Sequence, residues 1–184
     1  MAAGTSTVLI RRPTAPKAPD VSAPSYTLDK PLAGTTIGLR TDNAWRSWRV
    51  IAKVWQNKLE AAGAKTIQID SGGMIGQNRV NSKKTIEEFA GLVDGAFVGL
   101  GTCGSCTSFT ITDAVEVEDQ AKASVAIVTS EFETHGHNVA TFLGHRDLKV
   151  LVMPYPLEAL PDDELHDIAE QYWPQALELL GVTG

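Results

Sequence analysis

From residue 35 onward, the hydrophobic and polar positions of this chain follow two spacings. Short apolar runs bounded by Gly, Pro or polar residues are typical of buried strands, and such runs recur along the chain. Between them, apolar residues return at i, i+3, i+4 and i+7, which is the spacing of one buried helix face. The apolar runs predict five strands, at residues 36–40, 65–70, 96–100, 124–129 and 148–153.

The helical spacing predicts five helices, one after each strand. The first, over about residues 44–62, places Trp48 and Trp55 on one face, and Thr41-Asp42-Asn43 offers side chains that cap such a helix. The others are expected over residues 82–92, from Thr107 onward, over residues 132–143, and from Pro161 to Gly181, where Pro174 should kink the helix. Residues 71–81 match neither spacing, so we expect a loop there, and its Gly-rich part, residues 71–76, is expected to be mobile and to cover the functional site.

Strands that alternate with helices predict a parallel sheet with right-handed crossovers and helices on both faces. We therefore expect an α/β fold with a doubly wound five-stranded parallel sheet in the flavodoxin-like order 2-1-3-4-5. In this order the switch point lies between the first and third strands, and ligands bind beyond the C-terminal strand ends there. The loops that meet at this crevice are residues 40–46 and 101–107.

Residues 1–33 differ from the rest in composition, because five of the nine prolines fall there, with Ala, Ser, Thr and Lys between them. This composition predicts an extended arm, and residues 34–184 then form a single α/β domain. The arm is either disordered or wraps its own body or a partner. Wrapping a partner would make the protein a homo-oligomer or part of a hetero-complex.

The net charge of −6 argues against a nucleic-acid partner, which would favour a basic surface. No membrane partner is expected either, because no apolar stretch approaches the roughly 18 residues of a membrane span. Val8-Leu9-Ile10 is too short for the apolar core of a secretory signal, and Arg11-Arg12 follows it instead of preceding it. With only two cysteines there is no disulfide framework, so we expect a cytoplasmic protein.

Both cysteines lie in the turn between the third predicted strand and the next helix, Gly101-Thr102-Cys103-Gly104-Ser105-Cys106. The first N–H groups of such a helix point at the turn, and the positive end of the helix dipole favours thiolate over thiol. The C-x-x-C spacing lets one cysteine attack and the other resolve. Two alternatives stay open: a zinc site that includes His135 and His137, or cysteines that only pack.

The segment GLGTCGSCTSFTITDAV resembles the UGSC family, small bacterial proteins named for a U/C-G-S-C motif whose first position is selenocysteine in some members. That first position is Cys103 in this sequence, followed by Gly104, Ser105 and Cys106. Weaker similarity covers most of residues 30–184, in Leu39-Arg40-Thr41-Asp42, Glu131-Phe132 and Pro154-Tyr155-Pro156-Leu157. The resemblance implies that Cys103 is the attacking residue and leaves the reaction open.

Other polar side chains are expected at the same crevice and are candidates for substrate binding. After the first strand, Asp42 and Arg46 can bind a charged substrate beside Thr41, and Trp45 can form an apolar wall. In the cysteine turn, the side chains and N–H groups of Thr102, Gly104, Ser105 and Thr107 can bind an anion or oxyanion. After the fourth strand, Glu131, His135 and His137 are candidates, and a histidine there can act as base or proton donor. His145 and His166 are expected at the surface.

We expect a thiol-dependent enzyme in which Cys103 is a nucleophile or redox centre acting on a small-molecule substrate, and Cys106 resolves or packs. The second alternative is a non-redox lyase, hydratase or isomerase with Cys103 as acid–base or nucleophilic catalyst, by fold analogy with aspartate/glutamate racemase-like enzymes. The third is a non-catalytic subunit of a larger complex. No metal and no cofactor is expected: nucleotide-binding spacings are absent, and flavin binding has no residue signal.

Overall fold

The computed structural model describes residues 19–42, 44–71 and 77–183, and its centre is a parallel sheet. Five strands pair in the order β2-β1-β3-β4-β5, which confirms the predicted fold class and strand order. The strands are β1 (Thr36–Thr41), β2 (Lys65–Asp70), β3 (Gly95–Gly101), β4 (Ala123–Thr129) and β5 (Lys149–Met153). β3 and β4 are buried along their whole length, as expected where helices cover both faces of a parallel sheet.

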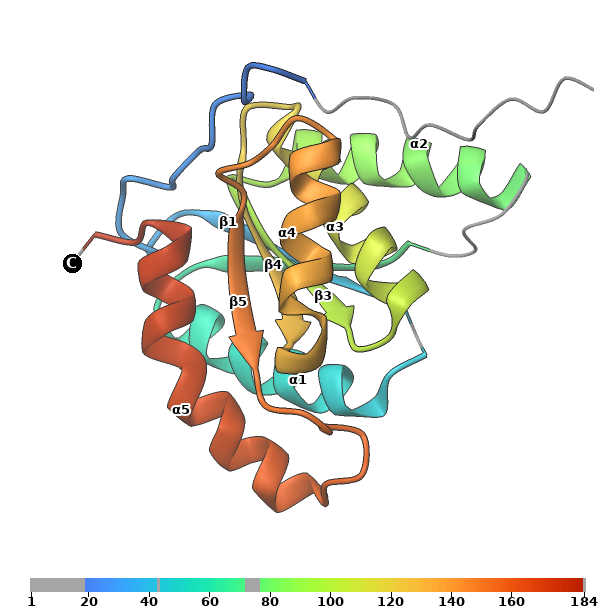
Figure 1. The fold of residues 1–184 in the computed structure, drawn as a ribbon. Coiled ribbons are helices and arrows are strands. Elements are labelled where there is room, and N and C mark those ends of the chain that lie inside the picture. The colour runs from blue at the N-terminus through green and yellow to red at the C-terminus, as the bar shows by residue number, and fades with distance from the viewer. Residues whose placement is uncertain (1–18, 43, 72–76, 184) are drawn as a thin grey trace, which may run out of the picture.

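Five α-helices of the described residues cover the two faces of the sheet (Figure 1). They are α1 (Arg46–Ala61), α2 (Gln77–Leu92), α3 (Gly104–Glu118), α4 (Glu133–Phe142) and α5 (Asp162–Leu180), the last running continuously through Pro174. One apolar cluster joins α1 and α5 to one face around Trp48, Trp55 and Phe97. The other joins α2, α3 and α4 to the opposite face around Phe89 and Ile111. Each such side chain contributes roughly 1.5–3 kcal/mol by its burial.

Two helices begin earlier than predicted. α2 begins at Gln77 and not at Ser82, so the prediction of a loop was wrong for residues 77–81, while residues 72–76 lie outside the described residues. Ser82 therefore lies inside this helix, and its hydroxyl donates to the carbonyl of Ser71. α3 begins at Gly104 and not at Thr107, because the side chain of Cys103 caps it. The added residues carry few apolar side chains, so the hydrophobic spacing could not mark them.

The start of α1 also differs from the prediction, because neither Thr41 nor Asp42 caps it, while Asn43 lies outside the described residues. Its N-cap is Trp45, whose side chain makes no capping hydrogen bond. The carboxylate of Glu158, after β5, instead accepts the N–H of Arg46 at 3.1 Å and of Ser47 at 3.0 Å. α1 is thus capped by a residue more than a hundred positions away, which joins it to the loop that precedes α5.

Residues 19–33 run in an extended path along the α/β body, past the C-terminal end of α5 (Figure 1). The N–H groups of Leu28 and Asp29 donate to the carbonyls of Leu180 and Gly181 at 2.8 and 2.9 Å. Leu28 and Leu32 are each only 7 % exposed and belong to the α1–α5 cluster. The described part of the arm therefore packs on its own chain.

His145 is buried, and its prediction as a surface residue was wrong. It follows α4, and its two ring nitrogens lie 3.0 Å from Glu118 Oε2 and 3.1 Å from Asp119 Oδ1, at the end of α3. Ser25 of the arm donates to the other Glu118 oxygen at 3.0 Å. The group formed by His145, Glu118 and Asp119 lies at the opposite end of α3 from the cysteines. His166, in contrast to His145, is exposed, as predicted.

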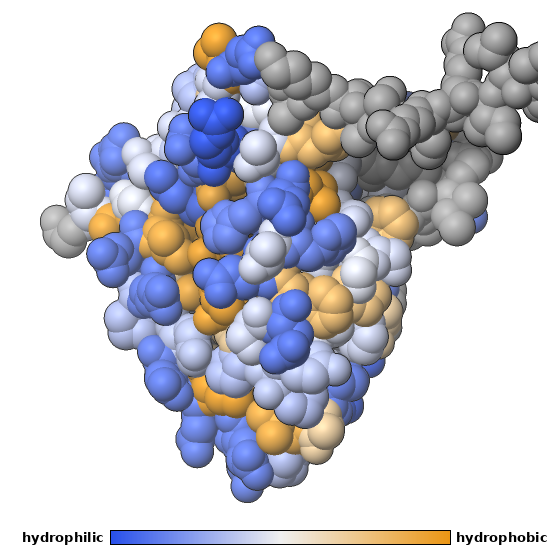
Figure 2. Space-filling model, in the orientation of Figure 1, coloured by the Kyte–Doolittle hydropathy of each residue, from blue (hydrophilic) through white to orange (hydrophobic). Residues whose placement is uncertain are grey.

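Hydrophilic and hydrophobic side chains are interspersed on the face over α4 and α5 (Figure 2). Among the helices of the described residues, none combines the length and apolar character needed to cross a lipid bilayer.

Candidate functional site

The cysteine turn lies where β3 ends and α3 begins, at the C-terminal edge of the sheet (Figure 1). β1 and β3 are paired neighbours although α1, β2 and α2 separate them in sequence, so the switch point falls between them. Gly101 permits the tight exit from β3, because a Cβ there would lie 2.9 Å from Thr107 Oγ1. The loops after β1 and β3 therefore lie at the same edge of the sheet, beside the switch point, as the strand order requires.

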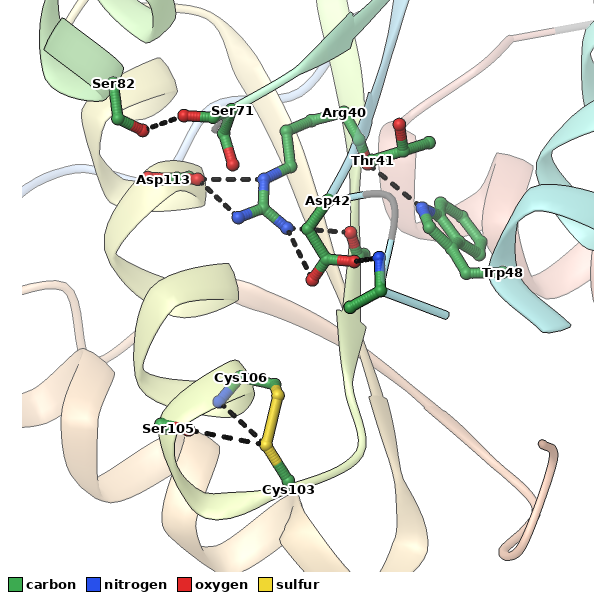
Figure 3. Close-up of polar contacts among 12 residues, drawn as sticks. Arg40, Thr41, Asp42, Trp48, Ser71, Ser82, Cys103, Ser105, Cys106 and Asp113 are labelled. Carbon is green, nitrogen blue, oxygen red and sulfur yellow. Dashed lines mark hydrogen bonds and ion pairs between the residues drawn. A yellow bond between two sulfur atoms is a disulfide. The ribbon is translucent and has the colours of Figure 1, made fainter. Parts of the chain in front are cut away.

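Cys103 is the N-cap residue of α3, and its sulfur takes the place of a capping oxygen. Its Sγ accepts the N–H of Cys106 at 3.1 Å, and the two cysteines form a disulfide (Figure 3). The Oγ of Ser105 lies 3.5 Å from the same sulfur. Both cysteines are half-buried, so reagents from solvent can reach the pair. The helix end thus directs its positive potential at Cys103 Sγ.

Two further side chains hold the cysteine turn in place. The hydroxyl and the N–H of Thr107 both donate to the carbonyl of Cys103, at 2.7 and 2.9 Å. Nε2 of His135, on α4, lies 3.0 Å from the carbonyl of Gly104 and 3.0 Å from the hydroxyl of Ser108. His135 therefore stands beside the residue that follows Cys103, where the sequence placed a candidate base.

A buried charged cluster lies at the same edge and is centred on Arg40 of β1, which is 1 % exposed. Its Nε and Nη2 lie 2.8 and 2.7 Å from Oδ2 of the buried Asp113 on α3. Nη1 donates to the carbonyl of Gly99 at 2.8 Å and lies 3.6 Å from Oδ2 of Asp42. The indole of Trp48 donates to the Arg40 carbonyl at 3.0 Å (Figure 3). One guanidinium thus links β1, β3 and α3.

Asp42 is a partly buried carboxyl group of this cluster, and its pKa is shifted. Its burial raises the pKa of the carboxyl above the ordinary aspartate value, while the Arg40 guanidinium and the Ala44 N–H act in the opposite direction. The negative charges of Asp70 and Asp113 add to the rise in the Asp42 pKa. A partly buried acid with a raised pKa at a switch-point crevice is typical of a functional group.

Three of the residues predicted at the crevice have structural partners instead. Arg46 pairs with Asp162 and donates to the carbonyl of Leu160, both at the start of α5. Trp45 packs half-buried against the α1–α5 cluster, and its Nε1 has no acceptor among the described residues. The buried Thr41 donates to the carbonyl of Ile69 at 3.2 Å. These contacts join β1 and α1 to their neighbours.

The remaining candidates follow β3 and β4. Thr102 accepts a hydrogen bond from Thr129 at 3.3 Å, which ties the cysteine turn to the end of β4. Glu131 and His137 are exposed, and His137 lies two residues from His135 on α4, hence on a different side of that helix. Within the described ranges, no three metal-binding side chains come together.

Two shallow grooves lie away from the cysteine turn, along α1 and α5 on the opposite face of the sheet. Their volumes are about 330 and 280 Å³, and Lys53 and His166 line both. They do not include a cysteine or a member of the Arg40 cluster. We therefore place the candidate site at the turn and the cluster.

Arg40 and Asp113 were not among the site residues expected from the sequence. The signal was present: Arg40 is a charged residue at the end of a predicted strand, and Asp113 is a charged residue among the apolar residues of a predicted helix. A charge in such a place is rarely tolerated unless it is paired. Opposite charges on two buried elements that meet at a switch point would have identified the pair.

Comparison with curated proteins finds no match to this chain. The family model that matches is the UGSC family, over residues 9–182, which is nearly the whole chain. The match includes the cysteine turn, the Arg40 cluster and the complete sheet. The chain therefore belongs to the UGSC family.

Proposed function

We propose that this protein is a thiol-dependent enzyme in which Cys103 attacks a small molecule, either an electrophile or a disulfide. With a disulfide, Cys106 resolves the mixed disulfide; with another electrophile, Cys106 only packs beside Cys103. The observation that carries the proposal is the position of Cys103 Sγ, which caps α3, accepts the Cys106 N–H and is bonded to the Cys106 sulfur. In a cytoplasmic protein, which this proposal also assumes, such disulfides are usually transient and catalytic.

Cys103 and Cys106 have different roles in the proposed reaction. In the reduced protein the N–H groups at the start of α3 stabilise the Cys103 thiolate, so Cys103 attacks first. On a disulfide substrate it forms a mixed disulfide and releases one substrate thiolate. Cys106 then attacks Cys103 Sγ and releases the second, which leaves the Cys103–Cys106 disulfide. The substrate has gained the two electrons that the protein has lost.

The experiment is the rate of alkylation of Cys103 by iodoacetamide against pH, in a Cys106→Ser variant. We expect a midpoint below the ordinary thiol value of about 8.5, in the range of about 3.5–7.5 found for cysteines at helix N-termini. The matched control is Cys106 in a Cys103→Ser variant, which lies inside the first turn and should titrate at higher pH. A Cys103 midpoint at or above the ordinary value would contradict the proposal.

A second candidate is a non-redox lyase, hydratase or isomerase, which is favoured by the presence of a partly buried acid, Asp42, at the same crevice. The cysteine variants separate the two. If Cys103→Ser abolishes turnover while Cys106→Ser retains it without added reductant, the non-redox candidate is correct. If both variants lose turnover and the wild type equilibrates with glutathione redox buffers, the redox candidate is correct. A non-catalytic subunit would tolerate both changes and lose assembly when residues 1–30 are removed.

A further inference from the structure

We infer that Asp42 exchanges a proton with Cys106 when the Cys103–Cys106 disulfide opens and closes, and that Arg40 and Asp113 position Asp42 for this exchange. The inference rests on the proposed thiol function and assigns a role to the charged cluster, which that function leaves unused. The cluster is costly to bury, because taking charges out of water costs several kcal/mol per ion before pairing compensates it.

The placement of Asp42 is the first argument. It follows β1, and the cysteine turn follows the neighbouring strand β3, so both lie at one edge of the sheet. Cys106 and Asp113 are seven residues apart on α3, which puts them on the same face two turns from each other. Figure 3 shows the Asp42 carboxylate on the side of the cluster that faces the cysteines, and the Cys106 sulfur on the near side of the disulfide.

The positioning of Asp42 is the second argument. Asp113 and the Gly99 carbonyl hold the Arg40 guanidinium in place. The distance from Arg40 Nη1 to Asp42 Oδ2 is 3.6 Å, which is longer than the distances from Arg40 to Asp113. The Ala44 N–H donates to Asp42 Oδ1 at 3.2 Å, which sets the plane of the carboxyl group. Asp42 is thus oriented by neighbours while its charge is only partly compensated.

The groups that face Asp42 also favour its protonated form. Burial is the largest cause of its raised pKa, and Asp70 at the end of β2 and Asp113 on α3 act in the same direction, against Arg40. An acid that keeps its proton to higher pH is a better donor to a leaving thiolate near neutral pH. Because the same neighbours raise the Asp42 pKa, they also make the Asp42 carboxylate a stronger base, which can take the proton back.

The proton exchange balances in both directions. When an external thiolate opens the disulfide, a new S–S bond forms to Cys103 and the Cys103–Cys106 bond breaks. Cys106 leaves with both electrons of that bond and takes the proton of Asp42. In the reverse step the Asp42 carboxylate removes the Cys106 proton, and the resulting thiolate displaces the external thiol from Cys103.

The experiment is the rate at which dithiothreitol opens the disulfide of the full-length protein, divided by the concentration of dithiothreitol thiolate, from about pH 4 to about pH 8. In the wild type this normalised rate should fall as pH rises through the pKa of Asp42. Asp42→Asn should remove the fall and lower the rate at the acid end by on the order of 100-fold, as for loss of a general acid.

Asp113→Asn tests the positioning role, because it removes a negative charge that raises the Asp42 pKa and leaves the Arg40 guanidinium to Asp42. The fall in normalised rate should then move to lower pH without disappearing. The control is Asp147→Asn, an exposed residue before β5 at the other end of the sheet, which should leave the profile unchanged. An Asp42→Asn profile that follows the wild type would overturn the inference.

A second measurement needs no change at Asp42. In a Cys103→Ser variant, the ¹³C signal of the Asp42 carboxyl should titrate in two steps, the second at the pKa of the Cys106 thiol, because coupled groups report each other's titration. The second step should vanish when Cys106→Ser is added, and a single step in both variants would overturn the inference. Failure of the proposed function is distinct, because it appears as an unreactive Cys103 in the alkylation assay.

Discussion

At the scale of single residues, the Arg40 guanidinium is held because each of its nitrogen atoms has an oxygen partner. Asp113 takes Nε and Nη2, and the Gly99 carbonyl takes Nη1, with Asp42 nearby. Asp42 is the less closely paired of the two carboxylates, since its nearest guanidinium contact is 3.6 Å. This asymmetry is what allows one aspartate to be structural while the other remains available for chemistry.

The same asymmetry predicts unequal costs of substitution. Arg40→Met should lower the free energy of unfolding by about 3–5 kcal/mol, because it leaves the buried Asp113 without its guanidinium partner. Asp113→Asn should cost less, because Arg40 keeps the Gly99 carbonyl and gains the full attraction of Asp42. Urea unfolding at neutral pH measures both. Equal costs, or a larger cost for Asp113→Asn, would contradict this account of the cluster.

The double variant Arg40→Met/Asp113→Leu serves as the control for that comparison. It replaces the buried ion pair by apolar groups, and such replacements are often neutral or stabilising. It should therefore recover most of the stability that Arg40→Met loses. If it is as unstable as the single variant, the loss comes from packing of the arginine stem and not from an uncompensated charge.

At the scale of elements, α1 depends on Glu158 for its start. Partial burial alone would raise the pKa of Glu158, but the hydrogen bonds from Ser47 and Arg46 outweigh it, and the net pKa lies below the ordinary glutamate value. A lowered pKa means that the folded state favours the ionised carboxylate. This contribution to stability is complete above the ordinary value and is lost as the pH falls through the folded-state pKa.

Glu158→Gln should consequently reduce the free energy of unfolding by about 0.5–2 kcal/mol at neutral pH, the range measured for loss of a helix cap. The difference from the wild type should shrink as the pH is lowered from neutral through the folded-state pKa of Glu158, which lies below the ordinary glutamate value. Urea unfolding of both proteins across this range checks the prediction. A constant difference at all pH values would show that the ionised carboxylate is not what caps α1. Glu164→Gln is the matched control, since Glu164 is an exposed glutamate in the first turn of α5.

Elements also explain which predictions from the sequence were correct. The five strands and their order follow from short-range patterns, because few sheet topologies are compatible with strands that alternate with helices. The candidate residues that the structure does bring to the crevice, among them Cys103, His135 and Asp42, follow strand ends, so topology alone gathers them. The predicted starts of these helices were wrong because a sulfur caps α3 and a distant carboxylate caps α1. No local pattern marks either cap.

The contacts of Arg46 also depend on distant parts of the chain. The partners of Arg46 are Asp162 and the Leu160 carbonyl, which are more than a hundred residues later in the chain and belong to the entry to α5. Their position depends on how α5 packs on α1, which is a property of the folded chain. The local sequence pattern predicts at which edge of the sheet a side chain lies. It does not show which residue that side chain contacts in the folded chain.

At the scale of the whole molecule, the arm joins the ends of several elements on the side away from the cysteines. Its described part pairs with residues after α5, and Lys30 lies 2.8 Å from Asp94 before β3. The hydrogen bond from Lys30, together with the Thr36 N–H, lowers the pKa of Asp94 below its ordinary value. Besides these hydrogen bonds, apolar anchors at Leu28 and Leu32 and an exposed ion pair at Lys30 hold the arm.

The free energies of the apolar contacts and of the ion pair decide which of them holds the arm more strongly. Leu28 is 7 % exposed in the α1–α5 cluster, so Leu28→Ala should lower the free energy of unfolding of the arm by about 2–5 kcal/mol. Lys30→Met removes an exposed ion pair, which contributes only about 0–1 kcal/mol. Hydrogen exchange of the Leu28 and Asp29 amides, which donate to α5 and its C-cap, reports opening of the arm directly. Exchange should accelerate about 30-fold or more in Leu28→Ala, since about 1.4 kcal/mol corresponds to tenfold, and less than about tenfold in Lys30→Met. The reverse order would mean that electrostatics, and not burial, fixes the arm to the body.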